Sequence, residues 1–248
     1  MTPTLLLHGF AGDVGDWTSV LTGEAVRAEP LFGHRGCAEP LLTSFEGEVD
    51  RIAVGCRTLG TPSLHVVGYS LGGRLALGLA TRHPTLCASV TVIGGQPGLS
   101  NASAREERLA ADARWSDLLD REGLDAFFEG WQAQPLFASQ SSFPDQVAAR
   151  QRRLRAHHSA RGLAQAMACL GLGAMPDLWP RLPAVQVPVR LITGESDLKF
   201  SAIATQMAAA LPNSEKRAIL GCGHNPLLER PEALGEMLHY PFQGRSTS

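Results

Sequence analysis

Short runs of apolar residues, rich in β-branched side chains, recur along the chain and are separated by longer segments whose apolar positions follow a helical period. A strand that is buried on both faces reads as such a continuous run. The predicted strands are residues 4–7, 64–68, 89–93, 189–193 and 215–220. Because most of them alternate with helical segments, the pattern predicts an α/β fold with a mostly parallel central sheet.

The pattern changes between residues 97 and 183, where the strand runs disappear. Helical patterns replace them at residues 104–121, 124–132, 145–157 and 160–170. An all-helical insertion of this size is typical of a cap over the sheet. We therefore predict an α/β core made of residues 1–96 and 184–248, and a helical cap segment made of residues 97–183.

The segment Gly68-Tyr69-Ser70-Leu71-Gly72 joins a predicted strand to a predicted helix. A serine between two glycines at such a junction can occupy a strained turn that exposes its hydroxyl group. The helix that follows contains further glycines, which allow it to pack closely on a sheet. This context predicts that Ser70 is the reactive group of an active site.

A serine hydroxyl needs a histidine to take its proton and a carboxylate to orient that histidine. Asp197 follows the predicted strand 189–193, and His224 follows the predicted strand 215–220. Serine, aspartate, histidine is the chain order of α/β hydrolases, in which ligands bind at the carboxyl ends of the strands. Glu195 remains the alternative carboxylate, and a loop histidine that caps the next helix remains the alternative interpretation of His224.

The first predicted strand ends in His8-Gly9-Phe10-Ala11-Gly12, the position from which this fold supplies a backbone amide to an oxyanion hole. We expect the two donors of that hole to be the amides of Phe10 and Leu71. A glycine turn without a catalytic role is the alternative. A phosphate site is less favoured, because no glycine-rich loop carries the lysine of a P-loop.

Composition narrows the class of protein further. The chain has 248 residues, 44% of them hydrophobic, and a formal net charge of -2, which suits one sizeable core and gives no bias toward nucleic acid or membrane. No apolar run approaches the length of a membrane span and the N-terminus lacks a secretory pattern, so we expect a cytoplasmic protein. The five cysteines have no metal-ligand spacing and suit reduced thiols.

Further segments match one known family. They are residues 7–10, 68–74, 97–99, 106–108, 115, 131, 134–139, 154–155, 176–178, 194–200 and 223–225. On these segments the chain resembles, over nearly its whole length, the SHCHC synthases of menaquinone biosynthesis, which produce 2-succinyl-6-hydroxy-2,4-cyclohexadiene-1-carboxylate and belong to the α/β-hydrolase superfamily. Arg74, Lys199 and the segment 131–139 are the more diagnostic matches, because the whole superfamily shares the serine turn and the triad.

This resemblance implies a lyase. Ser70, activated by His224 and Asp197, would remove a ring proton from SEPHCHC, the precursor that still carries a pyruvyl group, and pyruvate would be eliminated to give SHCHC. No acyl-enzyme, metal or organic cofactor is needed for this reaction. The alternative is a serine hydrolase of an anionic ester, thioester or C–C bond substrate. A non-catalytic binding protein on the same fold is a third possibility, which the intact triad disfavours.

The implied substrate carries several carboxylates, which cationic side chains can bind. Arg74 lies one helical turn after Ser70, and Lys199 lies two residues after Asp197, so we expect both cations to reach the pocket. Lysine is otherwise rare, since Lys216 is the only other one in the chain.

The cap segment supplies further expected contacts. Arg108 and Arg155 match the family's cap arginines, although Arg105 competes with Arg108 and the arginine-rich run 150–155 leaves the second position open. A solvated helix face is the alternative for each of them. The histidine pair at 157–158 forms no metal motif and is predicted to lie on the surface.

Tyr69 and Trp131 are expected to line the site as a hydrogen-bond donor and an apolar wall, with ordinary packing as the alternative for both. The chain also departs from the family. Ser100 stands where a glutamine is expected, Gln132 stands where a tyrosine is expected, and the loop 32–36 is an altered proline-glycine-histidine-glycine turn. These departures concern substrate contacts and leave the predicted triad intact.

Overall fold

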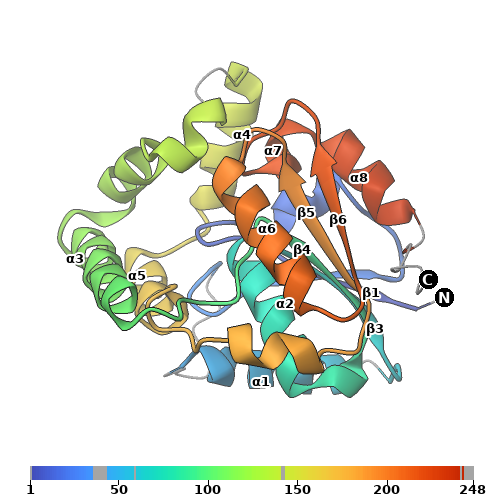
Figure 1. The fold of residues 1–248 in the computed structure, drawn as a ribbon. Coiled ribbons are helices and arrows are strands. Elements are labelled where there is room, and N and C mark those ends of the chain that lie inside the picture. The colour runs from blue at the N-terminus through green and yellow to red at the C-terminus, as the bar shows by residue number, and fades with distance from the viewer. Residues whose placement is uncertain (1, 36–43, 59, 141–142, 241, 243–248) are drawn as a thin grey trace.

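The computed structural model describes residues 2–35, 44–58, 60–140, 143–240 and 242. Its centre is a six-stranded sheet with the order β2-β1-β3-β4-β5-β6, in which every neighbouring pair is parallel (Figure 1). The strands are β1 (Thr4–Leu7), β2 (Val26–Glu29), β3 (Leu64–Tyr69), β4 (Cys87–Ile93), β5 (Val189–Gly194) and β6 (Ser214–Ile219). The predicted α/β fold class is confirmed.

The chain crosses from one half of the sheet to the other between β2 and β3, so β1 and β3 lie side by side at the point where the strand order reverses. Ligands of open parallel sheets bind beyond the carboxyl ends of the strands at such a point. The loop after β1 and the turn after β3 are therefore placed together at the expected binding edge.

Strand β2 is the one that the sequence pattern did not predict. Its four residues, Val26 to Glu29, alternate between apolar and charged side chains and form the outer edge of the sheet. An edge strand is short and carries charged side chains more often than a central one. Its sequence therefore lacks the continuous apolar run that identified the other five strands.

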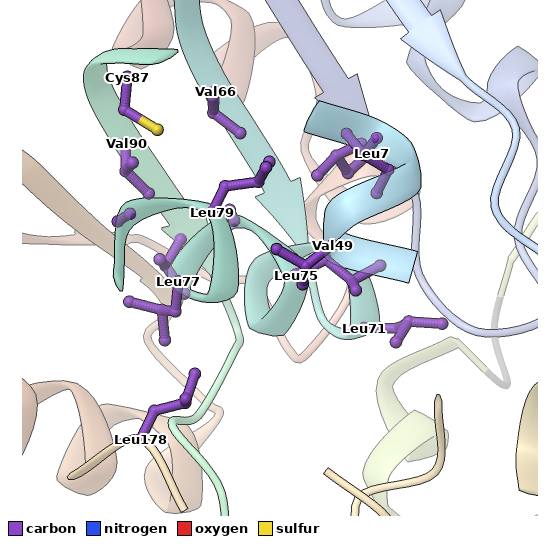
Figure 2. Close-up of a cluster of buried hydrophobic side chains, with 14 of the residues drawn as sticks. Leu7, Val49, Val66, Leu71, Leu75, Leu77, Leu79, Cys87, Val90 and Leu178 are labelled. Atoms are coloured by element: carbon purple, nitrogen blue, oxygen red, sulfur yellow. The ribbon is translucent and has the colours of Figure 1, made fainter. Parts of the chain in front are cut away.

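Helices cover both faces of the sheet. The core helices are α1 (Phe45–Arg57), α2 (Leu71–Arg82), α6 (Leu198–Ala210), α7 (Pro226–Glu229) and α8 (Pro231–His239). On one face, strand side chains such as Leu7 and Val66 pack against Leu75 and Leu79 of α2 and against α1 and α6 (Figure 2). On the other face, Leu6 and its neighbours pack against the 3-10 helix η1 (Val14–Ser19), α7 and α8.

The described elements between β4 and β5 are helical, and Figure 1 shows most of them as a separate group beside the sheet. They are α3 (Ala102–Gln132), η3 (Pro135–Gln140), α4 (Asp145–Arg155), α5 (Ala160–Leu170) and η4 (Trp179–Ala184). Helix α3 spans two of the predicted helices and breaks between them at Gly123, whose φ of 82° is non-helical. The division into a core and a cap segment at residues 97 and 183 stays a prediction.

A third hydrophobic cluster joins the cap segment to the core. Leu119, Phe127 and Leu163 from α3 and α5 pack with Ala11, and the half-buried Phe10 and Trp131 lie against them. The loop after β1 is thus part of the cap's own apolar packing. None of the helices in the described ranges is long and apolar enough to cross a membrane.

Candidate active site

Ser70 occupies a strained turn between β3 and α2. Its φ of 51° and ψ of -106° lie outside the regions that non-glycine residues normally adopt. The flanking glycines make the turn possible, because a Cβ at Gly68 would lie 2.1 Å from the carbonyl oxygen of Gly72, and a Cβ at Gly72 would lie 2.1 Å from that of Leu7. The serine hydroxyl is thereby presented at the carboxyl end of the sheet.

The three predicted triad residues meet at this edge. The Nδ1 of His224 donates a hydrogen bond to Oδ2 of Asp197 over 2.7 Å, and its Nε2 lies 3.5 Å from Oγ of Ser70. With the ring proton on Nδ1, the free Nε2 lone pair faces the serine hydroxyl. The second distance is long for a hydrogen bond, as is common in ligand-free sites whose contacts tighten when substrate binds.

The loop around His224 is held by several contacts. The ring of Phe200 lies 4.5 Å from the imidazole, and a Cβ at Gly94 would lie 2.9 Å from its Cε1. Glu229 accepts hydrogen bonds from the amides on both sides of the histidine, those of Gly223 and Asn225. The imidazole is 2% exposed, so it has little freedom to turn away from the serine.

The alternative carboxylate, Glu195, has a different partner. Its Oε2 accepts a hydrogen bond from the amide of Gly221 over 2.9 Å, and its side chain is exposed to solvent. Asp197 is buried and uses its second oxygen to accept from the amide of Phe200 over 3.2 Å. The structure therefore brings Asp197 and not Glu195 to the histidine.

The amides of Phe10 and Leu71, which the sequence predicts as oxyanion donors, belong to the loop after β1 and to the first residue of α2. Neither amide donates a hydrogen bond within the part of the chain that the structure describes. The amide of Gly72 donates to the carbonyl of His8 over 3.0 Å, which ties the loop after β1 to the serine turn. Two unused N–H groups beside a serine hydroxyl can stabilise a negatively charged oxygen.

A cavity with an empty volume of about 1140 Å³, open solvent at its mouth included, lies in front of Ser70. Eight residues predicted for the site line it: Phe10, Tyr69, Ser70, Arg74, Arg108, Trp131, Arg155 and Lys199. Gln132 also lines the cavity, whereas Ser100 does not. Side chains from the core and from the cap segment thus enclose one space.

Arg74 is buried in the wall of this cavity. It donates hydrogen bonds to the carbonyl of Leu170 over 2.8 Å and to the sulfur of Met175 over 3.6 Å, and no carboxylate of the described residues lies within 4 Å of it. Burial, followed by repulsion from Arg108, lowers the pKa of the guanidinium from 12.5 to about 9. A bound carboxylate would supply the missing counter-charge.

The arginines of α3 divide between two roles. Arg108 lines the cavity and donates from Nε to Asp112 over 2.7 Å. Arg105 instead donates to the carbonyl of Gly173 over 3.0 Å and is absent from the cavity lining. The structure therefore places Arg108, and not its competitor, beside Arg74.

The other two predicted cations reach the cavity over aromatic rings. The guanidinium of Arg155 lies 4.8 Å from the ring centre of Phe128, and burial lowers its pKa. The Nζ of Lys199 lies 5.5 Å from the ring centre of Phe200, and its side chain is exposed at the mouth. A cation over an aromatic face keeps its charge available to an anion in the cavity.

Sequence reasoning missed one acidic residue of the cavity. Asp16 is the only carboxylate among the described lining residues, and it accepts hydrogen bonds from the amide of Asp13 and from Gln151 of α4. Its burial raises the pKa of this carboxyl group, which favours the neutral form. A lone aspartate near a turn carries no sequence signal for such a position.

The histidine pair was predicted to lie on the surface, and for His158 this prediction is wrong. His157 is exposed, whereas His158 is 7% exposed and lies between α4 and α5 beside the loop that contains His34. Because the histidine pair lies just after the arginine-rich helix α4, its sequence context is polar and indicates an exposed position. Only the packing of the cap segment on the core buries it.

The described cysteines are free thiols, and burial raises the pKa of Cys222, two residues before His224, to about 12. Cys37 and Gly36 lie outside the described residues. The described ranges contain no group of three or more His, Cys, Asp or Glu side chains that could hold a metal ion.

Comparisons with known proteins agree with this geometry. The model of the alpha/beta hydrolase family matches residues 4–236. The chain is 35% identical to a 2-succinyl-6-hydroxy-2,4-cyclohexadiene-1-carboxylate synthase of Salmonella newport (strain SL254), covering 96% of this chain and 92% of that protein. It is 33% identical to the corresponding synthase of Enterobacter sp. (strain 638), covering 94% and 89%.

A solved structure is similar over the same length. MenH from S. aureus superimposes with a TM-score of 0.90 at 29% sequence identity, covering 96% of this chain and 91% of that one. A similarity that spans both the sheet and the helices between β4 and β5 extends beyond the shared serine turn.

Proposed function

The chain belongs to the α/β hydrolase family and, within it, to the SHCHC synthases of menaquinone biosynthesis, and on this basis we propose that Ser70, His224 and Asp197 form the catalytic triad of a lyase that eliminates pyruvate. The substrate is SEPHCHC and the products are SHCHC and pyruvate. The observation that carries the proposal is that Arg74 and Lys199, which form no ion pair with a carboxylate of the described residues, share one cavity with the serine.

In the proposed reaction, Ser70 acts as a base. Its hydroxyl proton passes to Nε2 of His224, whose Nδ1 is already hydrogen-bonded to Asp197, and the serine oxygen takes a ring proton of the substrate. The electron pair of the broken C–H bond forms the new ring double bond as the C–O bond to the pyruvyl group breaks. The leaving enolate takes up a proton and becomes pyruvate, so the serine forms no covalent bond to the substrate.

Negative charge that develops on the succinyl carbonyl would be stabilised by the amides of Phe10 and Leu71. Both are free to donate, one from the loop after β1 and the other from the first residue of α2. A single donor of this kind contributes roughly 3 to 4 kcal/mol to transition-state stabilisation in other serine enzymes. The two amides are therefore the largest electrostatic contribution that the backbone of this site can make.

The cations of the cavity would bind the substrate carboxylates and hold the ring against Ser70. Arg74 is buried and Arg155 is partly buried, both with lowered pKa values, and Lys199 adds a point charge at the mouth. Fixing the substrate in this way lowers the entropic cost of reaching the reactive geometry. Tyr69 and Trp131 would form the remaining donor and apolar wall.

A coupled assay tests the proposal. Purified protein is added to enzymatically generated SEPHCHC, and both pyruvate release and the absorbance of the new diene are followed. We expect release far above the spontaneous rate, abolished in Ser70→Ala with substrate binding retained. A rate equal to the spontaneous background would contradict the lyase and would favour hydrolysis of another anionic substrate, which a screen of esters and thioesters would reveal.

A further inference from the structure

Three non-glycine residues of the described chain have a positive φ, and two of them, Ser70 and Ala11, line the cavity. The third is Arg35 with a φ of 49°, and the φ of Ala11 is 56°. This backbone region is unfavourable for residues that carry a Cβ and persists only where surrounding contacts hold it. The strain at Ser70 is explained by the serine turn, but that at Ala11 and Arg35 needs another cause.

The amide of Ala11 is held by a histidine. It donates a hydrogen bond to Nε2 of His34 over 3.0 Å, while Nδ1 of the same ring donates to the carbonyl of Phe32 over 2.9 Å. The second bond fixes the tautomer that leaves Nε2 free to accept. Complete burial lowers the pKa of His34 well below its ordinary value, which keeps the ring neutral.

The amide of Arg35 is held in the same way, by a histidine of the cap segment. It donates to Nδ1 of His158 over 3.1 Å. His158 is buried, its Nε2 has no hydrogen-bond partner within the described residues, and burial lowers its pKa to about 4. A neutral imidazole therefore accepts from each of the two strained amides.

The rings of these histidines form a continuous column. The centres of His34 and His158 are 5.5 Å apart, and those of His8 and His34 are 5.0 Å apart. His8 continues into the loop after β1, where its Nδ1 donates to the carbonyl of Gly9 over 2.8 Å and its Nε2 accepts from the amide of Leu31 over 3.2 Å. We call His8, His34 and His158 the imidazole column.

The column lies directly behind the proposed oxyanion donor. The side chain of Phe10 is in contact with His34 on one side and Trp131 of α3 on the other, with ring centres 5.3 Å apart in both pairs. The loop that carries His34 also touches α5, because a Cβ at Gly33 would lie 2.1 Å from the carbonyl oxygen of Gly162. A shift of the cap segment would therefore displace the loop that holds Ala11 and Phe10.

We infer that His34 and His158 are positioning residues, which hold the loop after β1 in its strained form and so place the Phe10 amide opposite Ser70 only when the cap segment is packed on the core. The inference rests on the oxyanion hole of the proposed function. It assigns the cap segment a role in completing the catalytic geometry in addition to binding substrate. It also explains why the backbone amides of Ala11 and Arg35, two residues with a positive φ, each donate to an imidazole nitrogen.

Matched substitutions separate the hydrogen bond from simple packing. His34→Gln keeps an acceptor near the Nε2 position, and His158→Asn keeps one near the Nδ1 position, whereas His34→Leu and His158→Leu remove the acceptor. His157→Ala is the control, because this neighbouring side chain is exposed and contacts the carboxylate of Asp13 instead of a strained amide. Thermal unfolding of each variant shows whether it is folded.

Two quantities are measured on these variants: hydrogen exchange of the Ala11 amide by NMR, and kcat and KM for pyruvate release. We expect the leucine variants to lose about tenfold to a hundredfold in kcat with KM within about twofold, the loss that a displaced catalytic group causes. Exchange at Ala11 should accelerate in His34→Leu and in His158→Leu. The glutamine, asparagine and control variants should stay within a few-fold of the wild type in both quantities.

Equal losses in the leucine and the amide variants, or an unchanged kcat in all of them, would overturn the inference. If His34→Leu does not fold, the comparison of His158→Leu with His158→Asn decides the question. If the wild type itself releases no pyruvate, the proposed function fails on its own account. The exchange measurement does not depend on activity. If the Ala11 amide exchanges equally slowly in the wild type and in His158→Leu, the role of the imidazole column is refuted.

Discussion

The two walls of the cavity differ in what determines the position of their side chains. On the sheet wall, Ser70 directly follows β3 and His224 lies in the loop after β6, and close contacts at Gly68 and Gly72 for the serine and at Gly94 for the histidine leave them little freedom. On the cap wall, Arg108 and Arg155 reach in from α3 and α4 on long side chains, and Arg74 and Lys199 reach the same cavity from the core helices α2 and α6. Backbone geometry therefore determines the positions of the reactive groups, whereas the length of the side chains determines how far the groups proposed to bind substrate extend into the cavity.

The largest effect is expected at the sheet wall, from a substitution that removes a charge and keeps the shape of the side chain. Asp197→Asn should lower kcat by about 10⁴-fold, because the amide cannot hold the histidine in the tautomer that receives the serine proton. Glu195→Gln, two residues away, should leave kcat within about twofold, since that carboxylate bonds the amide of Gly221. Both are measured as steady-state pyruvate release.

The outcome of that pair distinguishes the two carboxylates directly. A large loss in Glu195→Gln, or none in Asp197→Asn, would show that the resting hydrogen bond of 2.7 Å does not report the catalytic partner of His224.

A second test concerns the backbone contacts of the serine turn. Gly68→Ala should destabilise the protein by about 3 to 5 kcal/mol, because its Cβ would lie 2.1 Å from the carbonyl oxygen of Gly72 and neither main chain can retreat. Gly55→Ala is the matched control in α1. It has no atom within 4 Å of the new Cβ and should stabilise the helix by about 0.5 to 1 kcal/mol. Urea unfolding of both variants gives the free energies of unfolding, and equal stabilities would contradict the steric explanation.

The difference between the sheet wall and the cap wall also explains which features could be predicted from the sequence. Five strands, the serine turn and the order of Ser70, Asp197 and His224 follow from local patterns, because apolar runs and glycine spacing encode them directly. Strand β2 lacked such a pattern, since an edge strand alternates with charged residues. The local signal is therefore strongest where the backbone itself determines the site.

Fewer side-chain positions on the cap wall could be predicted from the sequence. The choice between Arg105 and Arg108 depends on the rotation of α3, which bends at Gly123, and no local pattern specifies that rotation. Asp16 reaches the cavity, and His158 is buried, only because segments that are distant in sequence pack together. Such positions depend on tertiary contacts that periodicity does not encode.

The third test moves to the cap-facing cations, where smaller effects are expected. Arg74→Ala should raise KM by about tenfold to a hundredfold with kcat changed less, because the lost charge binds substrate and takes no part in the proton transfer. The dependence of KM on salt should also weaken. Arg105→Ala, which loses a bond to the carbonyl of Gly173 outside the cavity, should stay near wild type. An unchanged KM in Arg74→Ala would remove this residue from the proposed binding set.

The smallest effect is expected at the mouth, where solvent screens the charge. The two lysines of the chain form a natural pair, since Lys199 lines the cavity while Lys216 bonds Ser201 and Thr205 on the surface of α6. Lys199→Ala should raise KM by roughly threefold to tenfold at low salt, and the effect should fade as ionic strength rises, because an exposed charge interacts weakly. Lys216→Ala should leave KM unchanged at every salt concentration. Equal behaviour of the two variants would mean that substrate binding depends on the arginines of the cavity and not on the charge at its mouth.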